Sequence, residues 1–255
     1  MNEMFSIAGK TVVIAGSAGT VGMRLCNYLS ELGAGVAAID MNPTGALTEK
    51  ENAASRFYQC DITDQVALEK TAVKIQDDFG HIDVLINLVC TFGAGVKAME
   101  LPYERWKTDM KINVDTYFLT STVFGRYMMD QGGGSIINFA STASFSYIRG
   151  SYKTSYCVSK AAVASLTRSL AYEFAENKIR VNAIAPGFID IRENINSDSG
   201  SICTERERDR IDRVPLHKLA QIKDLLGPIV MFASDASSFV TGQVLLVDGG
   251  FLLYN

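Results

Sequence analysis

A tyrosine and a lysine four residues apart are the side chains best suited to proton transfer in this sequence. Tyr156 and Lys160 lie in the run Tyr156-Cys157-Val158-Ser159-Lys160, which opens a long helical pattern. Residues at this spacing share one face of a helix. A free tyrosine has a pKa near ~10, and a neighbouring ammonium favours the phenolate and lowers that pKa. We therefore expect this pair to exchange a proton with an alcohol without a histidine or a metal. A pair of surface side chains is the alternative.

A serine placed at the end of an apolar run adds a hydroxyl group to this chemistry. The run Ser135–Phe139 is predicted to form a strand, and Ser141 follows its carboxyl end. In doubly wound sheets, ligands bind outside that edge. Ser141 is therefore expected to hold a substrate oxygen beside Tyr156.

A glycine-rich turn near the amino terminus has the form of a phosphate-binding loop. The apolar run Thr11–Ala15 leads into Gly16-Ser17-Ala18-Gly19-Thr20-Val21-Gly22, and a helical pattern follows. Glycine lets a phosphate approach the main chain closely, and the start of a helix presents unpaired N–H groups to it. A simple tight turn is the alternative. The residues predicted to bind a dinucleotide here are Gly16, Gly19, Thr20, Val21 and Gly22.

Carboxylates follow the next two apolar runs. Asp40 lies ~20 residues beyond the glycine turn, where a carboxylate can accept hydrogen bonds from an adenosine ribose. It would repel a 2′-phosphate, and neither the glycine turn nor Met41 and Asn42 offers a cation, so the cofactor is predicted to be NAD. A loop or cap role is the alternative for Asp40. Asp61 suits a turn or cap as well as a contact with the adenine.

Composition excludes several classes of protein. The chain has 255 residues, of which 47% are hydrophobic, so it can build a large core and is not disordered. Its net charge of −4 and the lack of a Lys/Arg cluster argue against nucleic-acid binding. No apolar stretch reaches the ~18 residues of a membrane helix, and no signal peptide is visible. Five cysteines without CxxC spacing favour a reducing cytoplasm and argue against a metal site.

Short continuous apolar runs alternate with longer helical patterns along the whole chain. The predicted strands are Thr11–Ala15, Val36–Asp40, Arg56–Cys60, Val84–Leu88, Ser135–Phe139, Arg180–Ala185 and Val244–Val247. The predicted helices are Thr20–Leu32, Asp64–Phe79, Tyr103–Asp130, Ser155–Glu176 and Gln221–Ser234. This alternation predicts an α/β fold, a Rossmann-type doubly wound parallel sheet of about seven strands with helices on both faces, as a single domain over 1–255.

The least patterned part of the chain lies between the last two predicted strands. Asp190–Glu205 is long and polar, as binding loops often are. We expect residues 190–215 to form a substrate-binding loop or lid. Within that region the alternating charges of Arg206–Arg210 are typical of a solvated helix face.

These motifs, in this order, resemble the short-chain dehydrogenase/reductase family over nearly the whole chain. The resemblance also rests on Lys111-Ile112-Asn113-Val114, Arg180–Gly187, Thr241-Gly242-Gln243 and Val247–Gly250. It implies that Tyr156 is the general acid/base, that Lys160 lowers its pKa and binds the nicotinamide ribose, and that Ser141 orients the substrate oxygen. It implies further that Asn113 lies on a mid-helix kink and holds a water that relays protons from Lys160. The cofactor contacts that it adds are Ile62, Asn87, Tyr156, Lys160, Pro186, Gly187 and Ile189.

The chain departs from the usual family pattern at several positions. Thr20 stands where the commonest members have glycine, Asn87-Leu88-Val89-Cys90 replaces Asn-Asn-Ala-Gly, and Ile191 replaces a threonine that contacts the nicotinamide carboxamide. The stretch Ser144–Ser155 is longer than in the commonest members. It carries side chains that would suit a polar or anionic substrate, with a solvated loop as the alternative: Tyr147, Arg149, Tyr152 and Lys153.

The sequence thus predicts an NAD-dependent oxidoreductase that interconverts a secondary alcohol and a ketone in a polyol, sugar acid or sugar-derived substrate. A 3-oxoacyl thioester reductase is one alternative. A non-catalytic NAD-binding sensor or scaffold is another, against which the complete catalytic set argues. The predicted helices Ser155–Glu176 and Tyr103–Asp130 carry small and apolar residues. Related proteins pair these two helices across two-fold axes, so we predict a homotetramer. Burial of both helices within one subunit is the alternative.

Overall fold

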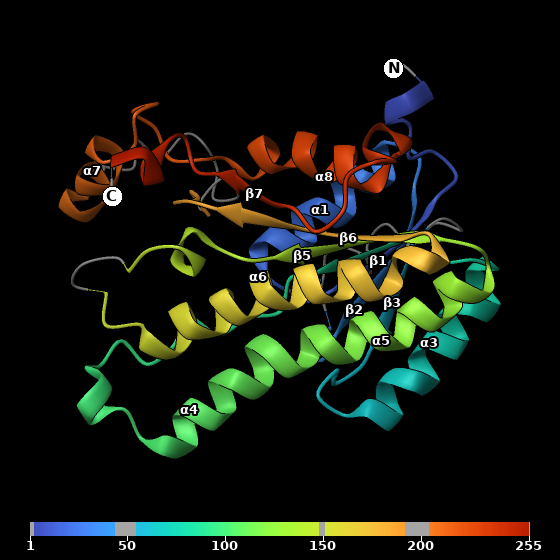
Figure 1. Cartoon of the computed structure of the whole chain (residues 1–255), viewed down its shortest axis with the longest axis horizontal. Coiled ribbons are helices and arrows are strands. Elements are labelled where there is room, and N and C mark those ends of the chain that lie inside the picture. Colours follow the sequence, from blue (N-terminus) through green and yellow to red (C-terminus); the bar gives the residue numbers. More distant parts are fainter. Residues whose placement is uncertain (1–2, 44–54, 148–150, 192–203, 255) are drawn as a thin grey trace.

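The computed structural model describes residues 3–43, 55–147, 151–191 and 204–254, and it places seven strands in one sheet (Figure 1). The strand order is β3-β2-β1-β4-β5-β6-β7, and all neighbouring pairs are parallel. This confirms the predicted doubly wound sheet. The strands are β1 (Thr11–Ala15), β2 (Gly35–Asp40), β3 (Ser55–Gln59), β4 (Val84–Asn87), β5 (Gly134–Phe139), β6 (Ile179–Pro186) and β7 (Val244–Val247).

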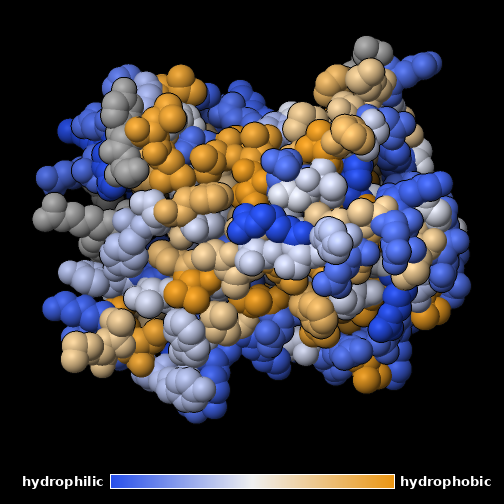
Figure 2. All heavy atoms as spheres, viewed as in Figure 1, coloured by the Kyte–Doolittle hydropathy of each residue, from blue (hydrophilic) through white to orange (hydrophobic). Residues whose placement is uncertain are grey.

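Helices cover both faces of the sheet, with α1 and α8 on one side and α3, α5 and α6 on the other (Figure 1). The helices are α1 (Thr20–Glu31), α3 (Gln65–Phe79), α4 (Tyr103–Met110), α5 (Thr116–Asp130), α6 (Thr154–Phe174), α7 (Glu205–Asp212) and α8 (Leu226–Ala233). The side drawn in Figure 2 carries hydrophobic patches among polar side chains over α5 and α6. None of the described helices is both long and apolar enough to cross a bilayer.

Alternate residues of β1 pack into two separate cores on opposite faces of the sheet. On β1, Val12 and Ile14 pack in the cluster that holds the buried residues of α1 and α8. Val13 and Ala15 pack in the cluster that holds those of α3, α5 and α6. Successive strand side chains point to opposite faces, so a strand covered on both faces must be apolar throughout. This is why the strands read as continuous apolar runs.

Two predicted helices differ from those observed. The predicted helix Tyr103–Asp130 is divided by a π-helical turn at Lys111–Asp115. The predicted helix Gln221–Ser234 begins as a 3₁₀ turn, and α8 starts only at Leu226. Pro228 lies in the first turn of α8, where its missing N–H costs no helical hydrogen bond.

The predicted lid contains a helix. Thr204 caps α7, and Thr204 and Glu207 form a reciprocal capping box. The alternating charges of this segment therefore lie on a helix, as expected. Residues 192–203, most of the unpatterned stretch, lie outside the described residues, as does Arg149.

Candidate active site

The four predicted catalytic residues come together at the carboxyl edge of the sheet. Ser141 follows β5, and its side chain is hydrogen-bonded to Tyr156 on α6. One turn along α6, the Lys160 ammonium lies 5.9 Å from the centre of the Tyr156 ring. Asn113 donates from Nδ2 to Oγ of Ser159 at 2.9 Å. Ser159 lies between Tyr156 and Lys160 on α6. The structure therefore joins residues that are up to 47 positions apart in the chain.

Lys160 is buried, and the chain itself satisfies its charge. Its Nζ donates to the carbonyl oxygen of Phe139 at 2.6 Å and to the hydroxyl of Tyr117 at 3.1 Å. The ammonium also lies 5.0 Å from the centre of the Tyr117 ring. Burial lowers the pKa of Lys160, because removal from water disfavours the charged form. Two fixed acceptors hold this cation in one position.

The pKa of Tyr156 moves in the direction opposite to the one expected from its lysine neighbour. Burial raises the pKa of Tyr156, nearby Cys90 raises it further, and the hydrogen bond with Ser141 lowers it. The expectation of a lowered pKa was wrong for this structure, because the removal of the phenol from water outweighs any stabilisation of the phenolate by Lys160, which donates its hydrogen bonds to Phe139 and Tyr117. At neutral pH the phenol is protonated, which is the form that can donate a proton to a carbonyl oxygen.

Asn113 lies in the π-helical turn, at the position where the family resemblance predicts a mid-helix kink. Its side chain is wholly buried. Oδ1 accepts the backbone N–H of Thr91 at 2.6 Å, and Nδ2 donates to the Thr91 carbonyl at 2.9 Å. Asn113 thus fixes the loop after β4 to α6. A water relay from Lys160 remains a prediction.

A cleft of about 650 Å³, a volume in the range of ligand pockets, is lined by Phe92, the aromatic neighbour of Tyr156, but by none of the four predicted catalytic residues. The predicted cofactor residues that line it are Gly16, Gly19, Thr20, Val21, Gly22, Asp40, Asp61 and Ile62. Residues that sequence analysis did not select also line it, among them Phe92, Thr108, Lys111 and Ile112. Of the described residues in this lining, Lys111 alone is cationic.

The glycine turn fits a diphosphate group. A Cβ at Gly16, where φ is +94°, would lie 2.8 Å from the Val89 side chain, and one at Gly22 would lie 2.8 Å from the Cα of Ser17. The N-cap residue of α1 is Gly19, which has no side chain to accept from the first helical turn. Within the described chain, the buried hydroxyl of Ser17 has no hydrogen-bond partner. Free donors and a closely approachable backbone are what a bound phosphate requires.

Asp40 and Asp61 both shape their loops and border the cleft. Asp40 accepts the N–H of Ala18 at 2.9 Å on Oδ2 and that of Asn42 at 3.0 Å on Oδ1. Asp61 accepts the N–H and the hydroxyl of Thr63 at 2.9 and 2.8 Å on Oδ1. The two readings of each residue are therefore compatible, since each carboxylate is held by its turn at the edge of the cleft.

The predicted cofactor residues that do not line this cleft are six: Asn87, Tyr156, Lys160, Pro186, Gly187 and Ile189. The side chain of Asn87 is buried and faces Asn138 and Thr120, at 2.9 and 2.7 Å. Gly187 donates its N–H to Val247, and a Cβ there would lie 2.9 Å from the Cα of Asp248. After β4 it is Leu88, Val89 and Cys90 that form the wall of the cleft.

An aromatic ring and a cation flank Tyr156 where the site meets solvent. The Phe92 ring is 61% exposed, and its centre lies 5.5 Å from that of Tyr156. The Lys153 ammonium lies 5.1 Å from the centre of the Phe92 ring and 5.8 Å from that of Tyr156. Sequence analysis singled out Lys153. It missed Phe92, because only the return of the loop after β4 across α6 brings that ring to the site.

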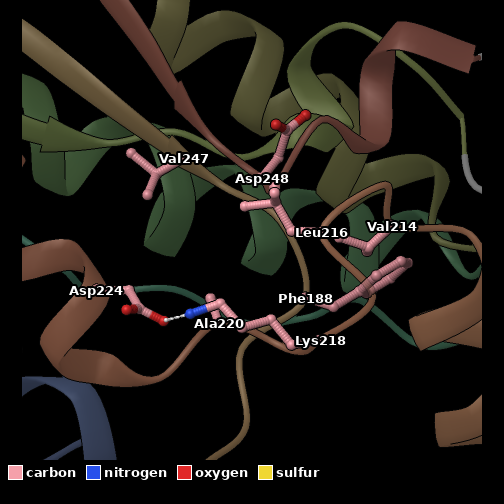
Figure 3. A pocket seen from close by; sticks show the side chains of 9 residues that line it. Phe188, Val214, Leu216, Lys218, Ala220, Asp224, Val247 and Asp248 are labelled. Carbon is pink, nitrogen blue, oxygen red and sulfur yellow. Dashed lines mark hydrogen bonds and ion pairs between the residues drawn. The ribbon is translucent and has the colours of Figure 1, made fainter.

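A smaller, mostly apolar pocket of about 180 Å³ lies beyond Gly187 (Figure 3). Phe188 lines it and packs edge-on against Phe251, with ring centres 4.9 Å apart. Lys218 and Asp224, which also line it, form an ion pair at 3.1 Å. This pocket lies between the segment that follows β6 and the C-terminal segment.

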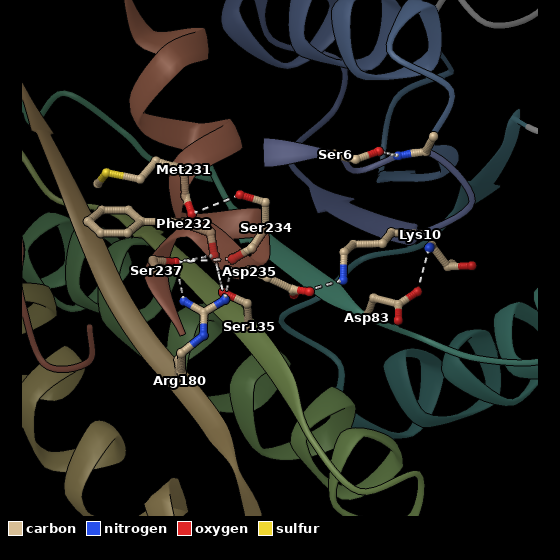
Figure 4. Close-up of polar contacts among 12 residues, drawn as sticks. Ser6, Lys10, Asp83, Ser135, Arg180, Met231, Phe232, Ser234, Asp235 and Ser237 are labelled. Carbon is tan, nitrogen blue, oxygen red and sulfur yellow. Dashed lines mark hydrogen bonds and ion pairs between the residues drawn. The ribbon is translucent and has the colours of Figure 1, made fainter. Parts of the chain in front are cut away.

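At the opposite end of the strands, near the start of β6, a polar cluster surrounds Arg180 (Figure 4). Its guanidinium donates to the carbonyl oxygens of Phe232 and Ser234, at 2.9 and 3.2 Å, and to Oγ of Ser237 at 2.6 Å. Arginine here satisfies the last carbonyls of α8. This cluster is structural. Among the described residues, no set of His, Cys, Asp and Glu could hold a metal ion, and the described cysteines form no disulfide.

The chain is similar to known dehydrogenases over almost its full length. The family model described as enoyl-(acyl carrier protein) reductase matches residues 16–252. A 2-dehydro-3-deoxy-D-gluconate 5-dehydrogenase of Bacillus subtilis (strain 168) is 33% identical, over 99% of this chain and 98% of that protein. An NAD-dependent glycerol dehydrogenase of Listeria innocua is 32% identical, over 98% and 96%. A gluconate 5-dehydrogenase from Burkholderia cenocepacia, solved with NADP and tartrate, superposes with a TM-score of 0.87 at 26% identity, over 98% of both chains.

Proposed function

The chain belongs to the short-chain dehydrogenase/reductase family, and from this premise we propose that it is an NAD-dependent dehydrogenase of polyols, sugar acids or related sugar-derived compounds. The reaction interconverts a secondary alcohol and a ketone. The observation that carries the proposal is the juxtaposition of Tyr156, Ser141 and Lys160 next to Phe92, which lines the cleft that also holds the glycine turn.

In this proposal, Tyr156 moves the proton. For reduction, Ser141 holds the substrate carbonyl, and the protonated phenol of Tyr156 donates to the same oxygen. For oxidation, the phenolate takes the hydroxyl proton of the alcohol. Lys160, fixed 5.9 Å from the ring, stabilises that phenolate through space. The bound nicotinamide supplies or accepts the hydride.

The preference for NAD rests on Asp40. Its carboxylate is held at the edge of the cleft by two backbone N–H groups, where it would repel a 2′-phosphate. The Listeria relative is NAD-dependent, whereas the Burkholderia structure holds NADP. Lys111, exposed on the lining of the cleft, is the cation that could favour a phosphate. The relative affinities of the protein for NADH and NADPH therefore test whether Asp40 or Lys111 determines the choice of cofactor.

The substrate class rests on the relatives and on the mouth of the site. The relatives act on a sugar acid and on a neutral triol, and the Lys153 ammonium beside Tyr156 adds a positive charge on the exposed side. A carboxylate can pair with an ammonium group. This charge favours an anionic sugar derivative over a neutral polyol.

A substrate screen tests the function directly. The purified protein is mixed with NAD⁺ or NADP⁺ and with a panel of sugar acids, neutral polyols and 3-hydroxyacyl thioesters, and the absorbance of the reduced nicotinamide is followed. We expect turnover of a sugar acid or polyol with NAD⁺ and none with the Tyr156→Phe variant. Turnover of the thioesters alone would favour the acyl reductase, and binding of NADH without any turnover would favour a sensor.

We also propose that the protein is a cytoplasmic homotetramer. Phe118 on α5 and Tyr172 on α6 are 50% and 87% exposed, and small residues such as Ala161 and Ser165 lie exposed along α6. An outward face of this kind supports pairing of these helices with those of a second copy. An odd number of cysteines without paired spacing supports the reducing compartment.

A further inference from the structure

A buried carboxylate that the proton-transfer scheme does not use lies against the start of α6. Asp109, on α4, is fully buried. Its Oδ1 accepts from the Thr91 hydroxyl at 2.7 Å and from Nε of Arg105 at 2.8 Å. Its Oδ2 accepts from the Ser155 hydroxyl at 2.5 Å. The carboxylate therefore joins three segments: the loop after β4, α4 and the first turn of α6.

These partners lead in two directions to Tyr156. Ser155 immediately precedes it on α6. Thr91 is held by Asn113 through both backbone groups, and Asn113 donates to Ser159.

The hydroxyl of Ser159 in turn donates to the backbone carbonyl of Tyr156 at 2.8 Å. Hydrogen bonds and one peptide link thus form a closed ring that runs Asp109, Ser155, Tyr156, Ser159, Asn113, Thr91 and back to Asp109.

The ring is charged rather than merely polar. Burial raises the pKa of Asp109, but the hydrogen bonds from Ser155, Thr91 and Arg105 together lower it by more, so that the pKa lies below its usual value. The carboxylate is therefore ionised at neutral pH. Charge-assisted hydrogen bonds are shorter and more directional than apolar contacts. A contact that only packed α4 on α6 would not require a buried charge, whose removal from water is costly.

We propose that Asp109 is a positioning residue for Tyr156: it fixes the start of α6 so that the phenol meets the substrate oxygen beside Ser141. This inference rests on the proposed dehydrogenase activity. A displacement of about 1 Å in a reacting group can cost about 10²-fold in rate, so the position of the first turn of α6 matters more to turnover than to stability.

Three variants test this role: Asp109→Leu, Asp109→Asn and Ser155→Ala. Leu removes every acceptor. Asn keeps Oδ1 for Thr91, and its amide can donate to the Ser155 hydroxyl, so it preserves the geometry of the ring. The control is Glu104→Gln, which neutralises an exposed carboxylate on the same helix. For each variant, kcat, KM, the Kd for NADH and the melting temperature are measured.

We expect Asp109→Leu and Ser155→Ala to lower kcat by about 10- to 100-fold, with KM and the Kd for NADH changed less than about twofold. Asp109→Asn, which keeps the geometry of the ring but not its charge, should give a kcat between those of Asp109→Leu and the wild type, and Glu104→Gln should match the wild type. The double variant Asp109→Leu/Ser155→Ala should be no slower than Asp109→Leu alone, because Asp109→Leu already removes the hydrogen bond that Ser155→Ala breaks.

Different outcomes separate the two proposals. An inactive wild type would overturn the dehydrogenase function and this inference with it. An active wild type whose Ser155→Ala variant keeps its kcat would overturn the positioning role alone. The positioning role would also be overturned if the variants lost activity only in proportion to their loss of NADH-binding sites, since that result indicates unfolding. If Asp109→Leu does not fold, Ser155→Ala and Asp109→Asn still decide the question.

Discussion

Lys160 stands 5.9 Å from the centre of the Tyr156 ring while it donates hydrogen bonds to Phe139 and Tyr117. The cation is therefore close enough to stabilise a phenolate, yet it is anchored to a strand end and a second tyrosine. The hydroxyl of Tyr156 remains available to Ser141 and to a substrate oxygen. This division of contacts underlies the kinetic predictions below.

Replacement of Tyr156 by phenylalanine should remove the proton donor and little else. We expect kcat to fall by about 10²–10⁴-fold, the usual worth of general acid/base transfer, with the Kd for NADH unchanged within about twofold. Stopped assays of turnover and fluorescence titration of NADH measure the two quantities. A variant that keeps more than about a tenth of the wild-type kcat would show that another group transfers the proton.

The raised pKa of Tyr156 sets the pH dependence of the two directions. Oxidation requires the phenolate, so its kcat should rise with pH across about pH 6–9, below the pKa of even an ordinary tyrosine. Reduction uses the protonated phenol, and its rate should be flat over the same window. Because the hydrogen bond from Ser141 lowers the pKa, Ser141→Ala should move the rise in oxidation to higher pH. Initial rates in both directions measure this, and an oxidation rate that is flat over the window would refute it.

Cofactor choice should depend on Asp40. Asp40→Ala should weaken NADH binding by about tenfold, as expected for the loss of one to two hydrogen bonds, and should improve NADPH binding. Asp40→Asn is the matched control, since its remaining oxygen can still accept from the backbone of the glycine turn. Calorimetric Kd values for both cofactors decide the matter. Tighter binding of NADPH than of NADH by the wild type would contradict the prediction.

Lys153 should discriminate between charged and neutral substrates. We expect Lys153→Gln to raise KM for a sugar acid by about tenfold, since each tenfold change corresponds to ~1.4 kcal/mol, while KM for a neutral polyol changes less than about twofold. Lys97→Gln, which removes an exposed cation elsewhere, serves as the control. Equal effects on the two substrate classes would show that Lys153 does not contact the carboxylate.

Assembly should depend on the outward face of α5. Static light scattering of the wild type should give a mass near four times 27.8 kDa. Phe118→Glu, which places a charge at a half-exposed apolar position, should reduce that mass. Val73→Glu makes the same change at an equally exposed position on α3 and should leave it unchanged. A wild-type mass near 27.8 kDa would rule out the tetramer.

The five inner strands were predictable because both of their faces are buried. A short uninterrupted apolar run such as Val84–Asn87 is typical of a strand that is buried on both faces. The observed strand ends lie within one or two residues of those expected. Gly16 and Asp40 both line the cleft because residues that follow neighbouring parallel strands lie at the same edge of the sheet. Local sequence therefore located the chemistry well where a strand end positions it.

Features that depend on packing between distant segments were not predictable. Asp109 lies in a polar stretch that reads as an exposed helix, and its burial requires Ser155, which is 46 residues away. The direction of the Tyr156 pKa depends on how thoroughly the folded chain removes the ring from water. Neither residue type nor spacing carries that information.

The π-helical turn at Lys111–Asp115 sets how far the side chains of α5 are rotated about the helix axis relative to those of α4. It holds one residue more than an α-helical turn would, so α4 and α5 are rotated relative to each other by about 100°, the angle of one residue. Asp109 lies before this turn and Asn113 within it, and both must face α6. Deletion of a single residue here would restore a regular helix and turn one of the two away, with every side chain of the site still present.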